Sequence, residues 1–176
     1  NGFKNMVCCG GNGCVIDNEL VENIPLDKDG CIKIIHQAEE LGYGWCVALD
    51  DTKDVYMTDD KFLRQVGKRK EPTRYIIDDM LEVEKADAIY KVYVAIPKED
   101  EEKLTTKELV GHLRFEPEYL MFQPDNKRGG IIKMMEHLNA DIKDVVVFGD
   151  DYNDMDMFCP EWFSIAVSYT HLRAHE

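Results

Sequence analysis

The stretch that decides the fold is Val145-Val146-Val147-Phe148-Gly149-Asp150-Asp151-Tyr152-Asn153-Asp154-Met155-Asp156-Met157-Phe158. An uninterrupted β-branched run is typical of a strand buried on both faces, and such strands belong mostly to parallel sheets that helices cover. Ligands of these sheets bind at the carboxyl ends of the strands. The turn at Gly149 follows directly and carries four oxygen donors, Asp150, Asp151, Asn153 and Asp154. The sequence therefore predicts a ligand-binding site at the turn that begins with Gly149.

The oxygen donors after the strand suit a hard cation. Mg²⁺ prefers oxygen ligands, keeps several waters, and is commonly held by one or two carboxylates together with phosphate oxygens. Phosphate chemistry is therefore the expected function. The alternative is an acidic surface turn, which a chain this acidic produces often. An EF-hand loop starting at Asp150 is excluded, because Tyr152 and Met155 stand where it needs an oxygen donor and Gly.

Three segments carry a family resemblance. The order Gly149-Asp150-x-x-Asn153-Asp154-x-x-Met157 after an apolar strand resembles the fourth motif of the haloacid dehalogenase (HAD) superfamily of phosphatases, and more narrowly its Cof-type branch with a C2-type cap. Asn12-Gly13-Cys14 is similar to the Asn-Gly-Ala turn at which Cof-type chains leave the core for the cap. Lys127 resembles the Lys of the third motif, although Arg128 stands where the family usually has Gly.

The resemblance implies an α/β fold, in which a Rossmann-like HAD core with a parallel sheet carries an inserted α/β cap domain. Only the C-terminal part of the core is expected in this chain. Residues 1–18 would be a partial core with the Asn-Gly turn, residues 19–122 the cap, and residues 123–167 the core with the third and fourth motifs. Residues 168–176 look like a non-native tail, so His171 and His175 are not expected to be ligands.

The resemblance also implies roles for individual residues. Asp150 would be a direct Mg²⁺ ligand, and Asn153 and Asp154 would complete the metal site by orienting water or phosphate. Lys127 would act in catalysis with Asp150, by binding both the nucleophile and the phosphoryl oxygens. Asn12, Asn153 and Lys127 are the expected substrate-binding residues.

The nucleophile that the family requires is not found. It should be the first Asp of an Asp-x-Asp pair after an early strand, and it forms an aspartyl-phosphate. Asp27-Lys28-Asp29-Gly30-Cys31 has the spacing but follows no strand. We interpret it as a loop entering a helix, and we expect the chain to be an N-terminally truncated, inactive fragment of its parent.

Composition limits the partners. The net charge of −14 argues against nucleic acid and anionic membranes, because both would repel the chain. No apolar run is long enough to cross a bilayer, so we expect a cytoplasmic protein, a monomer or weak dimer. The six cysteines show no Cys-x-x-Cys pair and are expected to be thiols; a zinc site at Cys8, Cys9 and Cys14 is the alternative.

Periodicity predicts the remaining elements. Helices are expected over residues 29–41, 78–85 and 98–109, and strands over residues 43–49, 55–58, 88–96 and 114–122. Pro117 should break the last strand or place it at an edge. A helix after Gly130 has an apolar stripe of Ile131, Met134, Met135 and Leu138, and Phe163 to Val167 is expected as the next strand.

The leading functional hypothesis is a Mg²⁺-dependent phosphatase, a hydrolase of small phosphorylated metabolites such as sugar phosphates. Two alternatives remain open. One is a non-catalytic module that binds a phosphorylated metabolite through Lys127 and Asp150, and the other is a phosphomutase. The sequence does not identify the substrate, because in this branch the cap selects it.

Overall fold

A computed structural model describes residues 3–68, 73–124, 126–150 and 152–167, without the side chains of residues 115, 152 and 153. The expected tail, residues 168–176, lies outside the described residues. The chain divides into two compact units. The first unit comprises Asn1–Asn23 and Asp125–Glu176, and the second comprises Ile24–Pro124.

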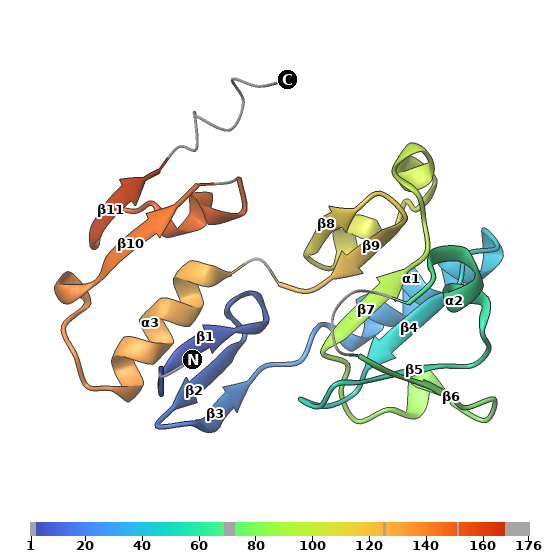
Figure 1. Ribbon diagram of the computed structural model, residues 1–176, viewed down its shortest axis with the longest axis horizontal. Helices are drawn as coiled ribbons and strands as arrows, with labels where there is room; N and C mark the ends of the chain where they lie inside the picture. Colours follow the sequence, from blue (N-terminus) through green and yellow to red (C-terminus); the bar gives the residue numbers. More distant parts are fainter. Residues whose placement is uncertain (1–2, 69–72, 125, 151, 168–176) are drawn as a thin grey trace. The chain divides into compact units, whose positions relative to one another are not determined.

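The second unit is built on a six-stranded sheet of order β6-β5-β4-β7-β9-β8 (Figure 1). Its neighbours are antiparallel except β5 and β6. The elements are α1 (Lys28–Glu40), β4 (Trp45–Ala48), β5 (Asp54–Met57), α2 (Lys61–Val66), β6 (Arg74–Ile77), β7 (Lys91–Val94), β8 (His112–Glu116) and β9 (Tyr119–Phe122).

Alternation along the central strands gives this sheet two apolar faces. Val47, Val92 and Phe122 face the cluster that contains Ile34 and Ile35 of α1. Cys46, Tyr93 and Met121, one position along each strand, face the cluster that contains Phe62 of α2. Because successive strand side chains point to opposite faces, each helix covers one face and the sheet is buried on both.

Most of the predicted elements in this unit are confirmed, with two exceptions. Residues 78–85 form only a 3₁₀ turn, η2 (Val83–Lys85), and residues 98–109 form two, η3 (Lys98–Lys103) and η4 (Lys107–Leu109). Leu104 is buried as expected, whereas Leu109 is exposed. Helical spacing predicts an inward stripe of α1 at Ile32, Ile35, Ala38 and Leu41. Ile35 and Ala38 are buried as predicted, together with Cys31 and Ile34, whereas Leu41 is exposed. The many charged residues in the two 3₁₀ segments are compatible with an exposed helix, but they do not specify a continuous α-helix.

The first unit combines a three-stranded antiparallel sheet with a helix and a parallel strand pair. Its elements are β1 (Met6–Cys8), η1 (Cys9–Gly11), β2 (Gly13–Ile16), β3 (Glu19–Asn23), α3 (Lys127–His137), η5 (Ile142–Asp144), β10 (Val146–Gly149), η6 (Tyr152–Met157) and β11 (Phe163–Ala166). Helix α3 packs on β1, β2, η1 and η6 (Figure 1).

Strand β3 corrects the predicted boundary at residue 19. Residues Glu19–Asn23 pair with β2 and belong to the first unit, so the second unit starts at Ile24. The tight turn of this hairpin is Asp17-Asn18, both with positive φ, as a two-residue turn requires. The predicted Asn12-Gly13 hairpin does join β1 to β2, but through the longer η1 connection, which carries three further positive-φ residues, Cys9, Gly10 and Gly11.

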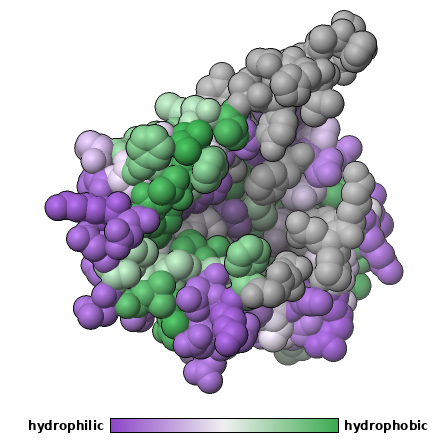
Figure 2. Space-filling model, turned by 60° about the vertical axis from the view of Figure 1, so that its left-hand side comes forward, coloured by the Kyte–Doolittle hydropathy of each residue, from purple (hydrophilic) through white to green (hydrophobic). Residues whose placement is uncertain are grey.

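Strand β10 is parallel to β11, as predicted, but it is not buried on both faces. Val147 is 7% exposed, whereas Val146 and Phe148 on the opposite face are 51% and 62% exposed. Phe163, the register partner of Val146, is 66% exposed. Hydrophobic residues lie beside hydrophilic ones on the surface in Figure 2. Within the described part of the chain, one face of this strand pair is covered and the other is open.

The second unit should fold on its own. Its sequence is continuous, and both apolar clusters consist entirely of residues between Ile24 and Pro124. We expect the isolated segment 24–124 to unfold in one cooperative urea transition. Trp45 is its only tryptophan and is buried, so its fluorescence reports the transition. A red-shifted Trp45 emission in the absence of urea would contradict the prediction.

No helix among the described residues is both long enough and apolar enough to cross a bilayer.

Candidate functional site

Lys127 is the first residue of α3, as the sequence predicted. Asn126 caps this helix, because its Oδ1 accepts a hydrogen bond from the Gly129 backbone N–H at 3.1 Å. The cap fixes the path of the chain into the helix. Lys127 is thereby held at the end of α3 that carries the positive end of the helix dipole.

The glycine-rich connection η1 packs backbone to backbone on the start of α3. The Asn126 N–H donates to the Gly10 carbonyl at 2.7 Å. A Cβ on Gly11, whose φ is +102°, would lie 1.8 Å from the Asn126 carbonyl oxygen, and one on Gly130 would lie 2.7 Å from the Gly11 oxygen. Only glycine permits this approach. The connection therefore lies directly beside Lys127.

Asp154 joins the start of α3 to the turn after β10. Its Oδ1 accepts from Lys127 Nζ at 2.6 Å, and its Oδ2 accepts from the Asp150 backbone N–H at 3.0 Å. The two side chains are 28% and 12% exposed. One carboxylate thus orients the Lys127 ammonium and the backbone of Asp150 together, and charge-assisted bonds of this kind are among the stronger ones in proteins.

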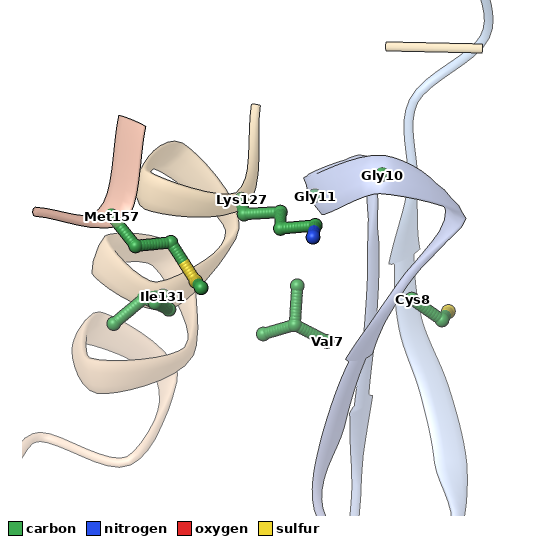
Figure 3. Close-up of a pocket in the computed structure, with 7 residues that line it drawn as sticks. All are labelled: Val7, Cys8, Gly10, Gly11, Lys127, Ile131 and Met157. Atoms are coloured by element: carbon green, nitrogen blue, oxygen red, sulfur yellow. The ribbon is translucent and has the colours of Figure 1, made fainter. Parts of the chain in front are cut away.

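A pocket of about 200 Å³ adjoins this ion pair. It is lined by Val7, Cys8, Gly10, Gly11, Lys127, Ile131 and Met157. Figure 3 shows Lys127 extending from α3 toward the turn at Gly10 and Gly11, while the Cys8 side chain points away from the pocket. Lys127 is the one charged side chain of this lining, so the pocket combines an apolar wall with a single cation.

Asp150 offers an available carboxylate. It is exposed at the carboxyl end of β10, and its side chain has no hydrogen-bond partner in the part of the chain that the structure describes. One or two carboxylates with phosphate oxygens and waters suffice for Mg²⁺, so Asp150 fits that ion. Across the described residues, no group of three or more His, Cys, Asp or Glu side chains is placed to hold a metal. Asp151 and the Asn153 side chain lie outside the described residues.

The sequence that forms this site matches a known protein family. A sequence profile of the haloacid dehalogenase-like hydrolases matches residues 2–171. The chain belongs to this family. Among curated protein sequences, none is significantly similar to this HAD-like chain.

Solved structures resemble this HAD-like chain over most of its length. A protein from Thermotoga maritima is 25% identical, with a TM-score of 0.69 over 90% of this chain and 62% of its own. A hypothetical protein from Geobacillus kaustophilus is 20% identical, with a TM-score of 0.69 over 95% and 65%. A sugar phosphatase of HAD subclass IIB is 16% identical, with a TM-score of 0.66 over 94% and 64%. The HAD-type α/β fold expected from the sequence is confirmed, and the chain spans slightly less than two thirds of these relatives.

In the HAD-like chain the predicted site residues fall into two groups. Lys127, Asp150 and Asp154 are brought together through the bonds described above. Asn12 follows η1, and its backbone N–H donates to the Cys9 carbonyl at 3.3 Å, so its role toward substrate stays a prediction. The metal-ligand roles also stay predictions. Asp27 caps α1 by accepting from the Gly30 N–H at 2.8 Å, which confirms that Asp27-Lys28-Asp29 leads into a helix.

Two amides in the first turn of α3 are already bonded. The Gly129 N–H donates to Asn126, and the Arg128 N–H donates to Asp156 Oδ2 at 3.0 Å. The positive character presented here is therefore mainly that of the Lys127 side chain. Sequence reasoning missed both acceptors. An Asn before a helix is a known capping signal, whereas nothing in the sequence marks Asp156.

Arg128 adds a side-chain contact between the same two regions. Its guanidinium forms an ion pair with Glu161, between η6 and β11. This hydrogen bond raises the pKa of Arg128. Hydrogen bonds from Cys159 and from its own backbone, followed by the bond from Arg128, lower the pKa of Glu161. Both partners are therefore charged at neutral pH.

Proposed function

We propose that the protein to which this chain belongs is a Mg²⁺-dependent phosphatase that acts on small phosphorylated metabolites such as sugar phosphates. The observation that carries the proposal is the link from Lys127 through Asp154 to Asp150 at the carboxyl end of β10. It occurs in a chain of the haloacid dehalogenase-like hydrolase family. It pairs a positioned cation with an available carboxylate, the combination that phosphate ester chemistry uses.

Lys127 supplies the fixed positive charge. Its hydrogen bond to Asp154 restrains the ammonium, so little reorganisation is needed when a phosphoryl group arrives. Two of its three N–H donors remain for phosphoryl oxygens and a nucleophilic carboxylate. Asp154 is 8% exposed and accepts from both Lys127 and the Asp150 amide, so it serves as the residue that orients both.

Asp150 would hold Mg²⁺ through its carboxylate, with Asn153 close by in sequence. The ion would supply positive charge that neutralises phosphate oxygens when bound. The apolar wall of the pocket, Val7, Ile131 and Met157, would limit water around the Lys127 ammonium and strengthen its electrostatic interactions. In this proposal the nucleophile that forms the aspartyl-phosphate comes from sequence outside residues 1–176, and the second unit is the cap that selects the substrate.

The test is an assay of the complete gene product against a panel of phosphate monoesters that includes sugar phosphates. We expect Mg²⁺-dependent release of inorganic phosphate, and a loss of about 10²-fold or more in Asp150→Asn, because the amide removes the anionic ligand. Asp144→Asn, an exposed carboxylate at the other end of β10, is the matched control and should keep the wild-type rate. A complete protein that binds Mg²⁺ and hydrolyses none of the panel would exclude the proposal.

A further inference from the structure

We infer that Asp156 is a positioning residue for Lys127. Its carboxylate holds the first turn of α3 against η6, and this contact sets where the Lys127 ammonium meets Asp154. The inference rests on the proposed function for its purpose, but its central contact is independent of turnover.

The inference starts from two adjacent contacts between the same two elements. Lys127 and Arg128 are consecutive at the start of α3, and Asp154 and Asp156 lie two residues apart in η6. The first contact joins Lys127 Nζ to Asp154 Oδ1 at 2.6 Å, and the second joins the Arg128 N–H to Asp156 Oδ2 at 3.0 Å.

These two contacts differ in stiffness. The Lys127 contact runs through a long side chain with four rotatable bonds, whereas the Arg128 contact fixes the backbone itself. Without Asp156, the helix start could shift relative to η6 while the lysine side chain followed by changing rotamer. The backbone contact is therefore the one that sets where the root of Lys127 lies.

Stability alone does not account for Asp156. Its other oxygen, Oδ1, is buried and has no hydrogen-bond partner within the described residues, and the same holds for Arg128 Nε. A carboxylate with one buried, unsatisfied oxygen costs free energy, and this cost offsets part of what its bond to the Arg128 N–H contributes to stability. The placement of the start of α3 beside Asp154 explains why Asp156 is present despite this cost.

The Arg128 side chain adds a second connection between the start of α3 and the region around η6. The Arg128 guanidinium pairs with Glu161, which follows η6 along the chain. Both partners are partly exposed, at 44% and 37%, so this pair contributes less than the backbone contact. Arg128 stands where the family usually has Gly, and a Gly there could not make this second contact. The departure from the family pattern thus coincides with an added connection to the same region.

The first test measures how freely Lys127 reacts in the chain 1–176. Reductive methylation followed by peptide mass spectrometry gives the labelling rate of each lysine. We expect Asp156→Ala to raise the rate at Lys127 by about tenfold, the scale of one lost charge-assisted hydrogen bond. Asp156→Asn retains an oxygen acceptor and should stay within about threefold of wild type. Thermal unfolding of each variant separates this local effect from a loss of fold.

Asp141→Ala is the matched control. Asp141 also accepts a backbone N–H through its side chain, from Lys143 at 3.0 Å, but in the η5 turn at the other end of α3. Asp141→Ala should leave the labelling rate of Lys127 unchanged. Equal acceleration by Asp141→Ala, or wild-type labelling in Asp156→Ala, would overturn the inference.

Two further measurements keep the inference testable if Asp156→Ala does not fold. The Arg128 amide proton resonance should move upfield in Asp156→Asn, because an amide oxygen is a weaker acceptor than the carboxylate that it replaces; an unchanged resonance refutes the contact. In the complete gene product, Asp156→Val, which removes both acceptor oxygens at similar volume, should lower kcat by about tenfold while KM changes less than about twofold. Unchanged kcat with altered labelling refutes the positioning role alone, whereas failure of the proposed function shows as absent hydrolysis in the unsubstituted protein.

Discussion

Replacing Lys127 by Met is expected to lower kcat for phosphate ester hydrolysis by the complete gene product by about 10³-fold. The Lys127 ammonium is the one charged group lining the pocket, and Asp154 holds it at 2.6 Å. Charge that develops on transferring phosphoryl oxygens would lose its fixed positive partner. Because this interaction strengthens in the transition state, kcat should fall much more than KM rises. Steady-state kinetics on one phosphate monoester measure both.

Lys127→Arg gives a second, graded result. It keeps the positive charge, but a planar guanidinium cannot reproduce the point charge and donor geometry of an ammonium. We expect partial activity, between wild type and Lys127→Met. Lys133→Met is the matched control, since Lys133 lies on the same helix and forms a comparable ion pair with Glu22 at 3.0 Å. A Lys127→Met protein that folds and hydrolyses at the wild-type rate would remove Lys127 from the mechanism.

Replacing Arg114 by Met is expected to destabilise the second unit by about 3 kcal/mol or more, the range seen when one member of a buried ion pair is removed. The Arg114 side chain is 13% exposed and its Nε donates to Glu101 at 2.8 Å. Its Nη1 donates to the carbonyls of Ile96 and Tyr119, both at 3.1 Å, and of Pro117 at 2.9 Å. One guanidinium therefore joins Glu101 and several carbonyls around the β8–β9 turn, and Met removes this shared donor from all of them at once. Urea unfolding monitored at Trp45 measures the loss.

Arg64→Met is the control for this result. Arg64 pairs with Asp60 on α2, but the two side chains are 64% and 56% exposed, so the change should cost about 0.5 kcal/mol or less. A loss in Arg114→Met no larger than in Arg64→Met would contradict the role of Arg114 as the centre of this turn.

The Glu101 carboxylate makes the stability of the second unit depend on pH. Burial raises its pKa, but hydrogen bonds from Arg114 and Lys107 outweigh burial, and the folded-state pKa is lowered. Its contribution to stability is therefore present above the unfolded pKa of about 4.3 and is lost as pH falls through the lower folded value. In Arg114→Met, this acid-dependent loss should be smaller.

The sequence predicted the pairing of the strand that precedes the candidate site more accurately than the burial of that strand. A β-branched run before Gly149 sufficed for a parallel strand, and β10 pairs in parallel with β11. The same run did not reveal that Val146 and Phe148 are exposed. Coverage of a strand depends on which other elements pack on it, and hydrophobicity along one segment contains no information about its neighbours.

In the second unit, too, the ends of elements were predictable from sequence, whereas burial was not. Gly42 ends α1 with φ +82°, as a glycine after a helix predicts. Pro117 separates β8 from β9, as a proline within a strand pattern predicts. The buried stripe of α1 keeps the predicted Ile35 and Ala38 but adds Cys31 and Ile34, because apolar residues adjoin on two sides of the helix and packing against the sheet selects between them.

By itself, the sequence determined the motif residues Lys127, Asp150 and Asp154, the acidic character of the chain and the α/β alternation, since each depends on residue type and short-range spacing. Only the tertiary structure decided that Asp154 binds the Lys127 ammonium and that Asp156 accepts from the Arg128 amide of α3. Hydrogen bonds between residues more than twenty-five positions apart depend on how whole elements pack. Short-range spacing cannot encode that packing, so the residues were predictable from sequence and their partners were not.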